Sequence, residues 1–363
     1  MYAPFHKQTT IPFSGDWPHR SGSIYGLSCG RVTSFTASLS NQTSEKPTNL
    51  PSAKTLQTDY HIFQTFNNCA PAGLSIALSF YGIKASQEEL AEALRPYNNL
   101  SGKNDDKSTP PEELAEIAKE YGLIPYFRPN GTIETLKQFI ASGMPVIVRT
   151  FLHPNEDFAH YRVVKGYDDA TKEIVQDDSL EGKDLRFSYD GFLKLWQPFN
   201  YGYLVLVPKE KQKTAEKILG KELNTEIAWQ HAIDRARREI DADRGISYPR
   251  YNLVTALYYA HDYAGAKNVF EAMESQITPH TLWYQIEPIG AYFELGNYDR
   301  VFELTDKIFA DGNVAASELY LLRGKSYLAK GDTASAKTEF EKAVLYNKNY
   351  KPAKEALLSL ANN

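Results

Sequence analysis

Cysteine is scarce in this chain. Its 363 residues include two cysteines, Cys29 and Cys69, and two cysteines cannot build the disulfide frameworks of small secreted domains. Residues 1–27 also lack the apolar core of a signal peptide. The sequence therefore leaves the compartment open, with the cytoplasm as the default expectation and an extracytoplasmic location as the alternative.

Long apolar runs and basic clusters are missing as well. No run approaches the ~18 apolar residues that span a membrane. The formal net charge is -5, and no cluster of lysine and arginine is interleaved with aromatic residues, so we do not expect nucleic acid as a partner. The histidines lack the spacing of a zinc pair on a helix, and no glycine-rich loop follows an expected strand. We therefore expect neither a metal nor an organic cofactor.

One of the two cysteines lies where a turn meets a helix. Cys69 follows two asparagines and precedes Pro71, which suits the first turn of a helix, and the helix is expected to end at Gly82. Backbone N–H groups in a first turn stabilise a nearby anion, so this position favours a thiolate. A buried structural cysteine is expected inside the apolar run that follows instead. We interpret Cys69 as a nucleophile.

A cysteine nucleophile needs a base and a group that orients that base. Residues 159–169 have the pattern of a strand that runs into a turn, and residues 173–176 that of its hairpin partner, which ends at Asp177 and Asp178. The start of the first strand then lies beside the end of the second, so His160 neighbours a carboxylate. Adjacent strand residues point to opposite faces, and this pattern leaves both aspartates open.

Other polar residues of the same region have simpler interpretations. His153 is a rival base in an expected loop, but it does not open a strand whose partner ends in carboxylates. Asp168 and Asp169 belong to the hairpin turn, where aspartate bonds to the backbone, and we interpret both as structural.

The order of these residues resembles that of papain-like cysteine peptidases, in the branch related to peptidases that process bacteriocins after double-glycine leaders. The resemblance covers roughly residues 56–208 and rests on the block Q-T-F-N-N-C-A-P-A and on H-Y-R-V-V-K-G-Y-D-D followed by V-Q-D-D-S. It implies that Cys69 is the nucleophile and His160 the general base and acid. Asp178 would then orient the imidazole, and Gln64 would donate to the oxyanion. The implied substrate is a peptide or a protein.

Two departures from that family keep a second hypothesis open. Ala70 stands where family members usually carry glycine, and Gln64 lies five positions before Cys69, where six is commoner. The alternative is a catalytically inactive or acyl-transferring relative that acts as a peptide-binding and interaction scaffold.

The C-terminal part of the sequence repeats. Tyr258, Tyr292 and Tyr327 recur at spacings of 34 and 35 residues, each before a turn. This resembles tetratricopeptide repeats, whose period is ~34 residues and whose units are helix pairs. A further helix is expected over residues 225–241, and residues 351–361 would cap the stack. Stacked helix pairs leave a concave face, where a substrate or protein partner is expected to dock.

The sequence thus predicts three parts. Residues 1–55 are expected to form a low-complexity tether, residues 56–210 an α+β papain-like cysteine peptidase domain, and residues 211–363 an all-α domain of tetratricopeptide-type repeats. The sparse apolar content of residues 209–217 indicates a linker, so the last two parts are expected to fold independently. The predicted function is cleavage of peptide bonds, with the repeats docking a substrate or partner.

Overall fold

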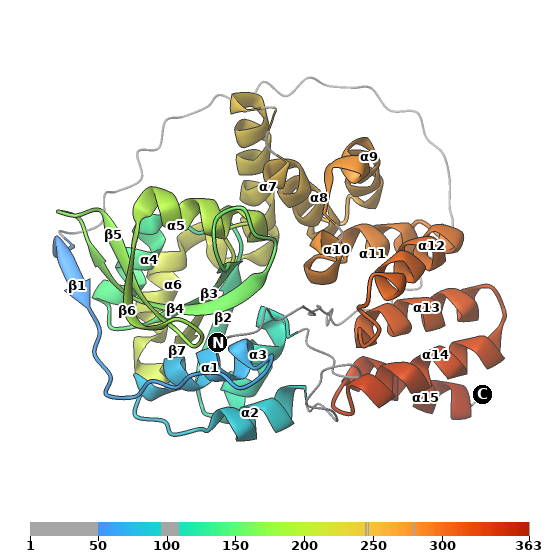
Figure 1. The fold of residues 1–363 in the computed structure, drawn as a ribbon, viewed down its shortest axis with the longest axis horizontal. Helices are drawn as coiled ribbons and strands as arrows, with labels where there is room; N and C mark the ends of the chain where they lie inside the picture. The colour runs from blue at the N-terminus through green and yellow to red at the C-terminus, as the bar shows by residue number, and fades with distance from the viewer. Residues whose placement is uncertain (1–49, 96–108, 244, 246, 279, 363) are drawn as a thin grey trace, which may run out of the picture.

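The computed structural model describes residues 50–95, 109–243, 245, 247–278 and 280–362. Within these residues, an antiparallel sheet lies between two layers of helices, and an array of helices follows it (Figure 1). This arrangement confirms an α+β domain followed by a helical one. Most of the predicted tether lies outside the described residues.

The sheet has seven strands. Six of them follow one path, in the order β2 (Ile124–Arg128), β7 (Tyr203–Val207), β3 (Val146–Phe151), β4 (Ala159–Asp168), β5 (Glu173–Asp178) and β6 (Gly182–Ser188). The seventh, β1 (Ala53–Thr55), pairs with the last residues of β4. This strand corrects the predicted tether at its C-terminal end, because Ala53 to Thr55 form backbone pairs with β4 in place of a chain without order.

Alternate residues of the buried strands supply the two cores on either side of the sheet. Val146 and Val148 of β3 pack on one face, and Ile147 between them packs on the other, as the period of a strand requires. The first face is covered by α4 (Ile133–Ala141), α5 (Tyr189–Trp196) and α6 (Gln212–Leu219). The second is covered by α1 (Cys69–Ser79), α2 (Gln87–Leu94) and α3 (Pro111–Glu120).

Local sequence signals mark the starts of two helices. Ser86 and Glu89 form the reciprocal capping box at the start of α2, in which each side chain accepts a hydrogen bond from the backbone N–H of the other residue. Pro111 opens α3 at a position where its missing N–H costs nothing. The two strands that were expected to carry the base and its partner are β4 and β5.

The predicted linker is wrong. Residues 209–211 form a short 3-10 helix, and α6 follows it directly. Ala215 and Leu219 of α6 are buried against the sheet, and Ile218 packs beside them. These apolar residues recur at i, i+3 and i+4, so they form one stripe of an amphipathic helix despite a charged overall composition. The first unit therefore extends past the predicted boundary at residue 210.

The C-terminal part consists of paired helices that follow α7 (Thr225–Ala242). Successive pairs are α8 (Tyr248–Tyr259) with α9 (Tyr263–Met273), α11 (Glu287–Glu294) with α12 (Tyr298–Ala310), and α13 (Ser317–Ala329) with α14 (Thr333–Tyr346). The short α10 (Thr281–Tyr284) precedes the second pair, and α15 (Lys351–Ala361) packs on α14. Each of the three tyrosines at the repeat spacing lies in the first helix of its pair.

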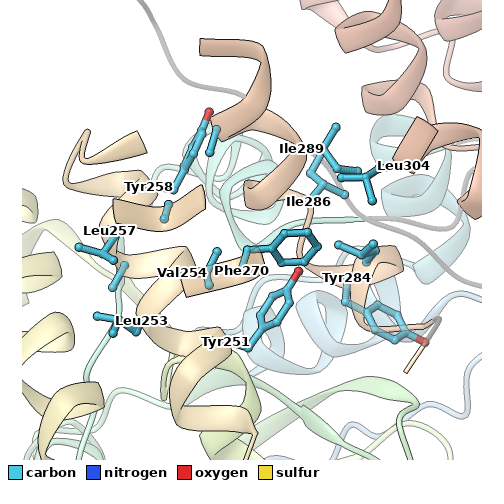
Figure 2. Close-up of a cluster of buried hydrophobic side chains, with 14 of the residues drawn as sticks. Tyr251, Leu253, Val254, Leu257, Tyr258, Phe270, Tyr284, Ile286, Ile289 and Leu304 are labelled. Atoms are coloured by element: carbon cyan, nitrogen blue, oxygen red, sulfur yellow. The ribbon is translucent and has the colours of Figure 1, made fainter. Parts of the chain in front are cut away.

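The helical part and the sheet share one hydrophobic core. Its central cluster, shown in Figure 2, includes Tyr251 and Val254 of α8, Phe270 of α9 and Ile289 of α11. Ala159 of β4 and Phe199, which follows α5, belong to the same cluster. The two parts are therefore in continuous apolar contact, and the independent folding predicted from the sequence is not supported by this packing.

Polar contacts also join the two parts at a second place. Arg95, which caps α2, pairs with Glu113 of α3 at 2.6 Å and with Glu318 of α13. The side chains of Arg95 and Glu318 are 3% and 1% exposed. The side-chain amide of Asn349 donates to the backbone carbonyls of Glu92 and Ala93 in α2. Figure 1 accordingly shows α13, α14 and α15 on the side of the molecule where α2 and α3 lie.

Candidate active site

Cys69 is the first residue of α1. Asn67, two residues earlier, has a φ of 58°, a left-handed conformation that asparagine tolerates better than most residues. Asn68 turns its amide toward the Thr65 hydroxyl and makes no side-chain cap to the helix. Because the Asn68 side chain does not cap the helix and Pro71 has no N–H, the backbone N–H groups of Cys69 and Ala70 are the ones that can stabilise an anion at Cys69. The predicted helix start is confirmed.

His160 lies near the beginning of β4, and its ring contacts both predicted partners. The Nε2 atom is 2.7 Å from Oδ1 of Asp178, at the end of β5. Cys69 also lies close enough to the imidazole to raise the pKa of His160. With Nε2 engaged by the carboxylate, Nδ1 is the ring nitrogen left for the thiol. His160 and Asp178 are buried, whereas Cys69 is partly exposed, so the sulfur atom is the accessible member of the three.

A β-bulge decides which aspartate reaches His160. From the turn, Gly166 pairs with Val175, but the next pair is Val164 with Gln176, so Lys165 has no partner opposite it. The shift brings Arg162 opposite Asp178 and therefore puts Asp178 on the face that His160 shares with Arg162. Without the bulge, Asp177 would occupy that face, because a slip of one residue reverses the faces.

The electrostatic environment supports a charged pair. Burial lowers the pKa of His160, but its hydrogen bonds with Asp178 and Cys69 outweigh burial and raise the pKa to about 9. Burial raises the pKa of Asp178, and the hydrogen bond to His160 and the charges of His160 and Arg162 outweigh it, so this pKa lies well below its usual range. The pair is therefore an imidazolium beside a carboxylate at neutral pH.

Gln64 lies next to this pair, in the segment before α1. Its backbone N–H donates to the carbonyl of Ser179 at 2.7 Å, and its Oε1 accepts from the Ser179 hydroxyl at 2.9 Å. Because the carbonyl end of the side chain is engaged, its amino group is the end that Gln64 offers as a donor. Ser179 directly follows Asp178, so the turn after β5 fixes the position of Gln64 relative to Asp178.

The residues that the sequence left as alternatives lie elsewhere. His153 is half-exposed and contacts Glu156 and Glu181, not the cysteine. Asp177 faces away from His160 and pairs with the buried Lys165 at 2.6 Å. Asp168 accepts hydrogen bonds from the backbone of the turn after β4, and Asp169 pairs with Lys137. Asp168 thus bonds to the backbone as expected for a turn, whereas Asp169 contacts the side chains of Lys137 and Tyr189.

Sequence reasoning missed Arg162, which contacts the carboxylate oxygen of Asp178 that His160 does not contact. Its Nε donates to Oδ2 of Asp178 at 2.7 Å, and the residue is fully buried. A signal was present: the basic side chains of residues 159–167 are His160, Arg162 and Lys165, and the facing strand ends in two aspartates. Two buried cations opposite two carboxylates predict two ion pairs, because buried charges are almost always paired.

A second missed group lies between the sheet and the helices. Glu112 of α3 and Glu287 of α11 each interact electrostatically with Arg149 of β3. Burial raises the pKa of each of these carboxyls to about 7. The charges of Cys69, Glu112 and Arg149 all act on Tyr161, the residue after His160. Glu287 of the helical part therefore shares the electrostatic influence of Arg149 with Tyr161, the neighbour of His160.

The described residues contain no group of three His, Cys, Asp or Glu side chains arranged to hold a metal ion. Among the same residues, none of the helices combines the length and the apolar character that crossing a bilayer requires. Cys29 lies outside the described residues.

Comparison with known proteins finds a family model that matches part of the chain. Residues 40–204 match the model of the Peptidase C39 like family. The match supports a papain-like cysteine peptidase domain, and its range contains the cysteine, the histidine and the aspartate described above. None of the curated proteins compared with the chain matches it.

Among the solved structures that are similar to part of the chain is one of a protein of a related description. It is a crystal structure of a protein described as a C39-like peptidase from Bacillus anthracis, with 17% sequence identity and a TM-score of 0.36. The likeness covers 43% of this chain and 98% of that one.

Proposed function

We propose that this protein is a cysteine peptidase that cleaves peptide bonds with Cys69 as nucleophile, His160 as general base and acid, and Asp178 as the residue that orients the imidazole. The observation that carries the proposal is the buried hydrogen bond between His160 and Asp178 at 2.7 Å, with Cys69 at the start of a helix and close enough to the imidazole to raise its pKa. The family match over residues 40–204 is consistent with this chemistry.

The reaction would proceed by acyl transfer. The Cys69 thiolate attacks the peptide carbonyl, the C–N bond breaks, and the His160 imidazolium gives its proton to the leaving amine. Neutral His160 then takes a proton from water, which attacks the thioester carbonyl. The C–S bond breaks, the new carboxyl group is released, and the Cys69 thiolate and the His160 imidazolium are restored. The backbone N–H of Cys69 and the side-chain amino group of Gln64 would stabilise the oxyanion in both steps.

The helical part would contribute tetratricopeptide-type units. The repeated N-cap positions Asp262, Asn297 and Asp332 begin the second helix of each pair, at 35-residue intervals. Glycine in the first helix also recurs: a Cβ at Gly290 would lie 2.8 Å from the ring of Tyr258, and one at Gly324 2.4 Å from the ring of Phe340. Such close helix packing is typical of stacked pairs, and we propose that the stack helps to dock a peptide or protein substrate.

A mutational experiment tests the nucleophile. In a Cys29→Ser background, where Cys69 is the only thiol, Cys69→Ala is expected to lower cleavage of a mixture of synthetic peptides by about 10³-fold or more. Products are measured by mass spectrometry, and thermal unfolding is measured on the same samples. The melting temperature should barely change, because Cys69 is partly exposed and the substitution removes one atom.

Three outcomes are informative. Retained cleavage in the Cys69→Ala protein would contradict the assignment of the nucleophile. Cleavage that requires an added amine, with that amine joined to the product, would instead indicate the acyl-transferring alternative. No cleavage in either protein, together with peptide binding to both, would favour the inactive scaffold.

A further inference from the structure

Arg162 makes contacts that go beyond the three residues of the proposed mechanism. We propose that it is a positioning residue, which holds the Asp178 carboxylate in the orientation that receives His160 in the cysteine peptidase proposed above. The guanidinium approaches Asp178 from the opposite side to the imidazole: Nε donates to Oδ2 at 2.7 Å, while His160 is on Oδ1 at 2.7 Å. Each carboxylate oxygen thus has its own cationic partner.

The other end of the guanidinium is anchored to the strand on the far side of β4. Its Nη1 donates to the Thr150 hydroxyl at 2.6 Å and to the carbonyl of Phe151 at 2.9 Å, and Nη2 donates to the carbonyl of Leu152 at 2.8 Å. Nη2 also reaches Glu181 at 3.2 Å. One buried side chain therefore joins the ends of β3 and β5 across β4, the strand that carries His160. A planar guanidinium can do this because its N–H groups diverge in fixed directions.

The groups that donate hydrogen bonds to Asp178 all favour its charged form. Besides the two cations, the backbone N–H groups of Leu180 and Glu181 donate to Oδ1 at 2.7 and 3.0 Å. Among the residues that contact Asp178 or Arg162 in the hydrogen bonds above, Glu181 is the other acidic residue, and its carboxylate accepts a hydrogen bond from Arg162. Removal of the guanidinium would leave a buried carboxylate with one cation and an unoccupied oxygen, free to rotate or to take a proton.

The alkylation rate of Cys69 provides a test that needs no known substrate. In the Cys29→Ser background, the rate of reaction with iodoacetamide is measured between pH 3 and 10. In the native protein the rate should be highest where the thiolate and the imidazolium coexist. Arg162→Met is expected to move the acid limb of this profile upward by about one pH unit, because Asp178 would take a proton sooner and His160 would lose its anionic partner.

Arg95→Met is the matched control. Arg95 is also a buried arginine paired with carboxylates, but its partners are Glu113 and Glu318. We expect both arginine variants to lose stability, and only the Arg162 variant to change the pH profile. Arg162→Lys and Thr150→Val, which weaken the anchor while keeping a cation on β4, should shift the acid limb in the same direction by a smaller amount. These two variants carry the test if Arg162→Met does not fold.

The possible results separate this inference from the proposed function. An alkylation rate in the native protein equal to that in urea at every pH would overturn the proposed nucleophile, and with it this inference. A fast, pH-dependent rate in the native protein with an unchanged acid limb in the folded Arg162 and Thr150 variants would overturn the positioning role alone. An equal shift in the Arg95 variant would do the same, because it would reflect general loss of stability.

Discussion

At the scale of single residues, the candidate site depends on a few buried charges. His160 and Asp178 are buried side by side, and Arg162 is buried against the same carboxylate. Isolated charges would be strongly unfavourable there, but the groups are paired and hydrogen-bonded, which keeps them ionised. Ionised partners are what a thiolate mechanism needs, so the same contacts stabilise the fold and prepare the proposed chemistry.

The titration of this pair predicts how stability changes with pH. The contribution of His160 is complete below its unfolded pKa of 6.5 and is lost as the pH rises through about 9. That of Asp178 is present above its unfolded pKa of 3.8 and is lost at lower pH. In urea unfolding, His160→Gln should therefore destabilise most between pH 3.8 and 6.5, by on the order of 2 kcal/mol, and least near pH 10.

The control for this titration is His153→Gln. His153 also has carboxylate partners, but its side chain is 46% exposed, so solvent screens the interaction. Its effect on the unfolding free energy should be small at every pH. A His160→Gln effect that is constant from pH 4 to 10 would show that the buried imidazole does not titrate as described.

At the scale of elements, glycine sets how closely the repeated helices pack. Gly324 lies in α13, and a Cβ there would be 2.4 Å from the ring of Phe340 and 3.1 Å from the carbonyl oxygen of Ala336 in α14. A small change of rotamer can displace the ring, but the backbone carbonyl is held by the helix. The close approach of α13 and α14 therefore requires glycine at this position.

Gly324→Ala provides the corresponding prediction. Alanine favours a helix by about 1 kcal/mol over glycine, whereas overpacking costs about 1–3 kcal/mol. Because both a ring and a backbone atom are too close, we expect net destabilisation in urea unfolding, partly relieved by adding Phe340→Leu. The same substitution at Gly73, where the nearest contact is the Tyr161 Cβ at 3.6 Å, should be neutral or stabilising. Equal effects at the two glycines would contradict the packing argument.

At the scale of the whole molecule, the C-terminal helices and the sheet part are packed as one unit. They share the cluster of Figure 2 with Ala159 and Phe199 of the sheet part, and the Arg95–Glu318 pair is buried at a second contact. An apolar core that spans both parts should make them unfold together, because neither can expose its share without loss to the other.

Two substitutions across the same boundary test this view. Glu318→Gln should lower the free energy of unfolding by about 3–5 kcal/mol, because it leaves a buried arginine with one fewer anionic partner. Lys348→Gln removes an ion pair with Glu92 whose two side chains are 59% and 64% exposed, and should cost less than about 1 kcal/mol. Urea unfolding followed by tryptophan fluorescence should show one transition. Two separate transitions would support independent domains instead.

Much of the first unit follows from local patterns. The start of α1 at Cys69, the capping box of α2 and the pairing of β4 with β5 rest on neighbouring residues, whose chemistry is readable in order. The prediction of a linker at residues 209–217 was wrong because it needed information from distant residues. The apolar stripe of α6 consists of Ala215, Ile218 and Leu219, and whether so short a stripe packs depends on the surface of the sheet that it meets.

By itself the sequence determined the candidate nucleophile, the base and the period of the helices, because each depends on residue type and spacing. The choice between Asp177 and Asp178 was made by the bulge at Lys165, which reverses the faces of everything beyond it along the pair. The sequence shows two cations opposite two aspartates, but only the tertiary structure decided that Arg162 pairs with Asp178 and that the helices pack on the sheet. Such contacts depend on the register of strands and on surfaces far apart in the chain, and no local pattern encodes either.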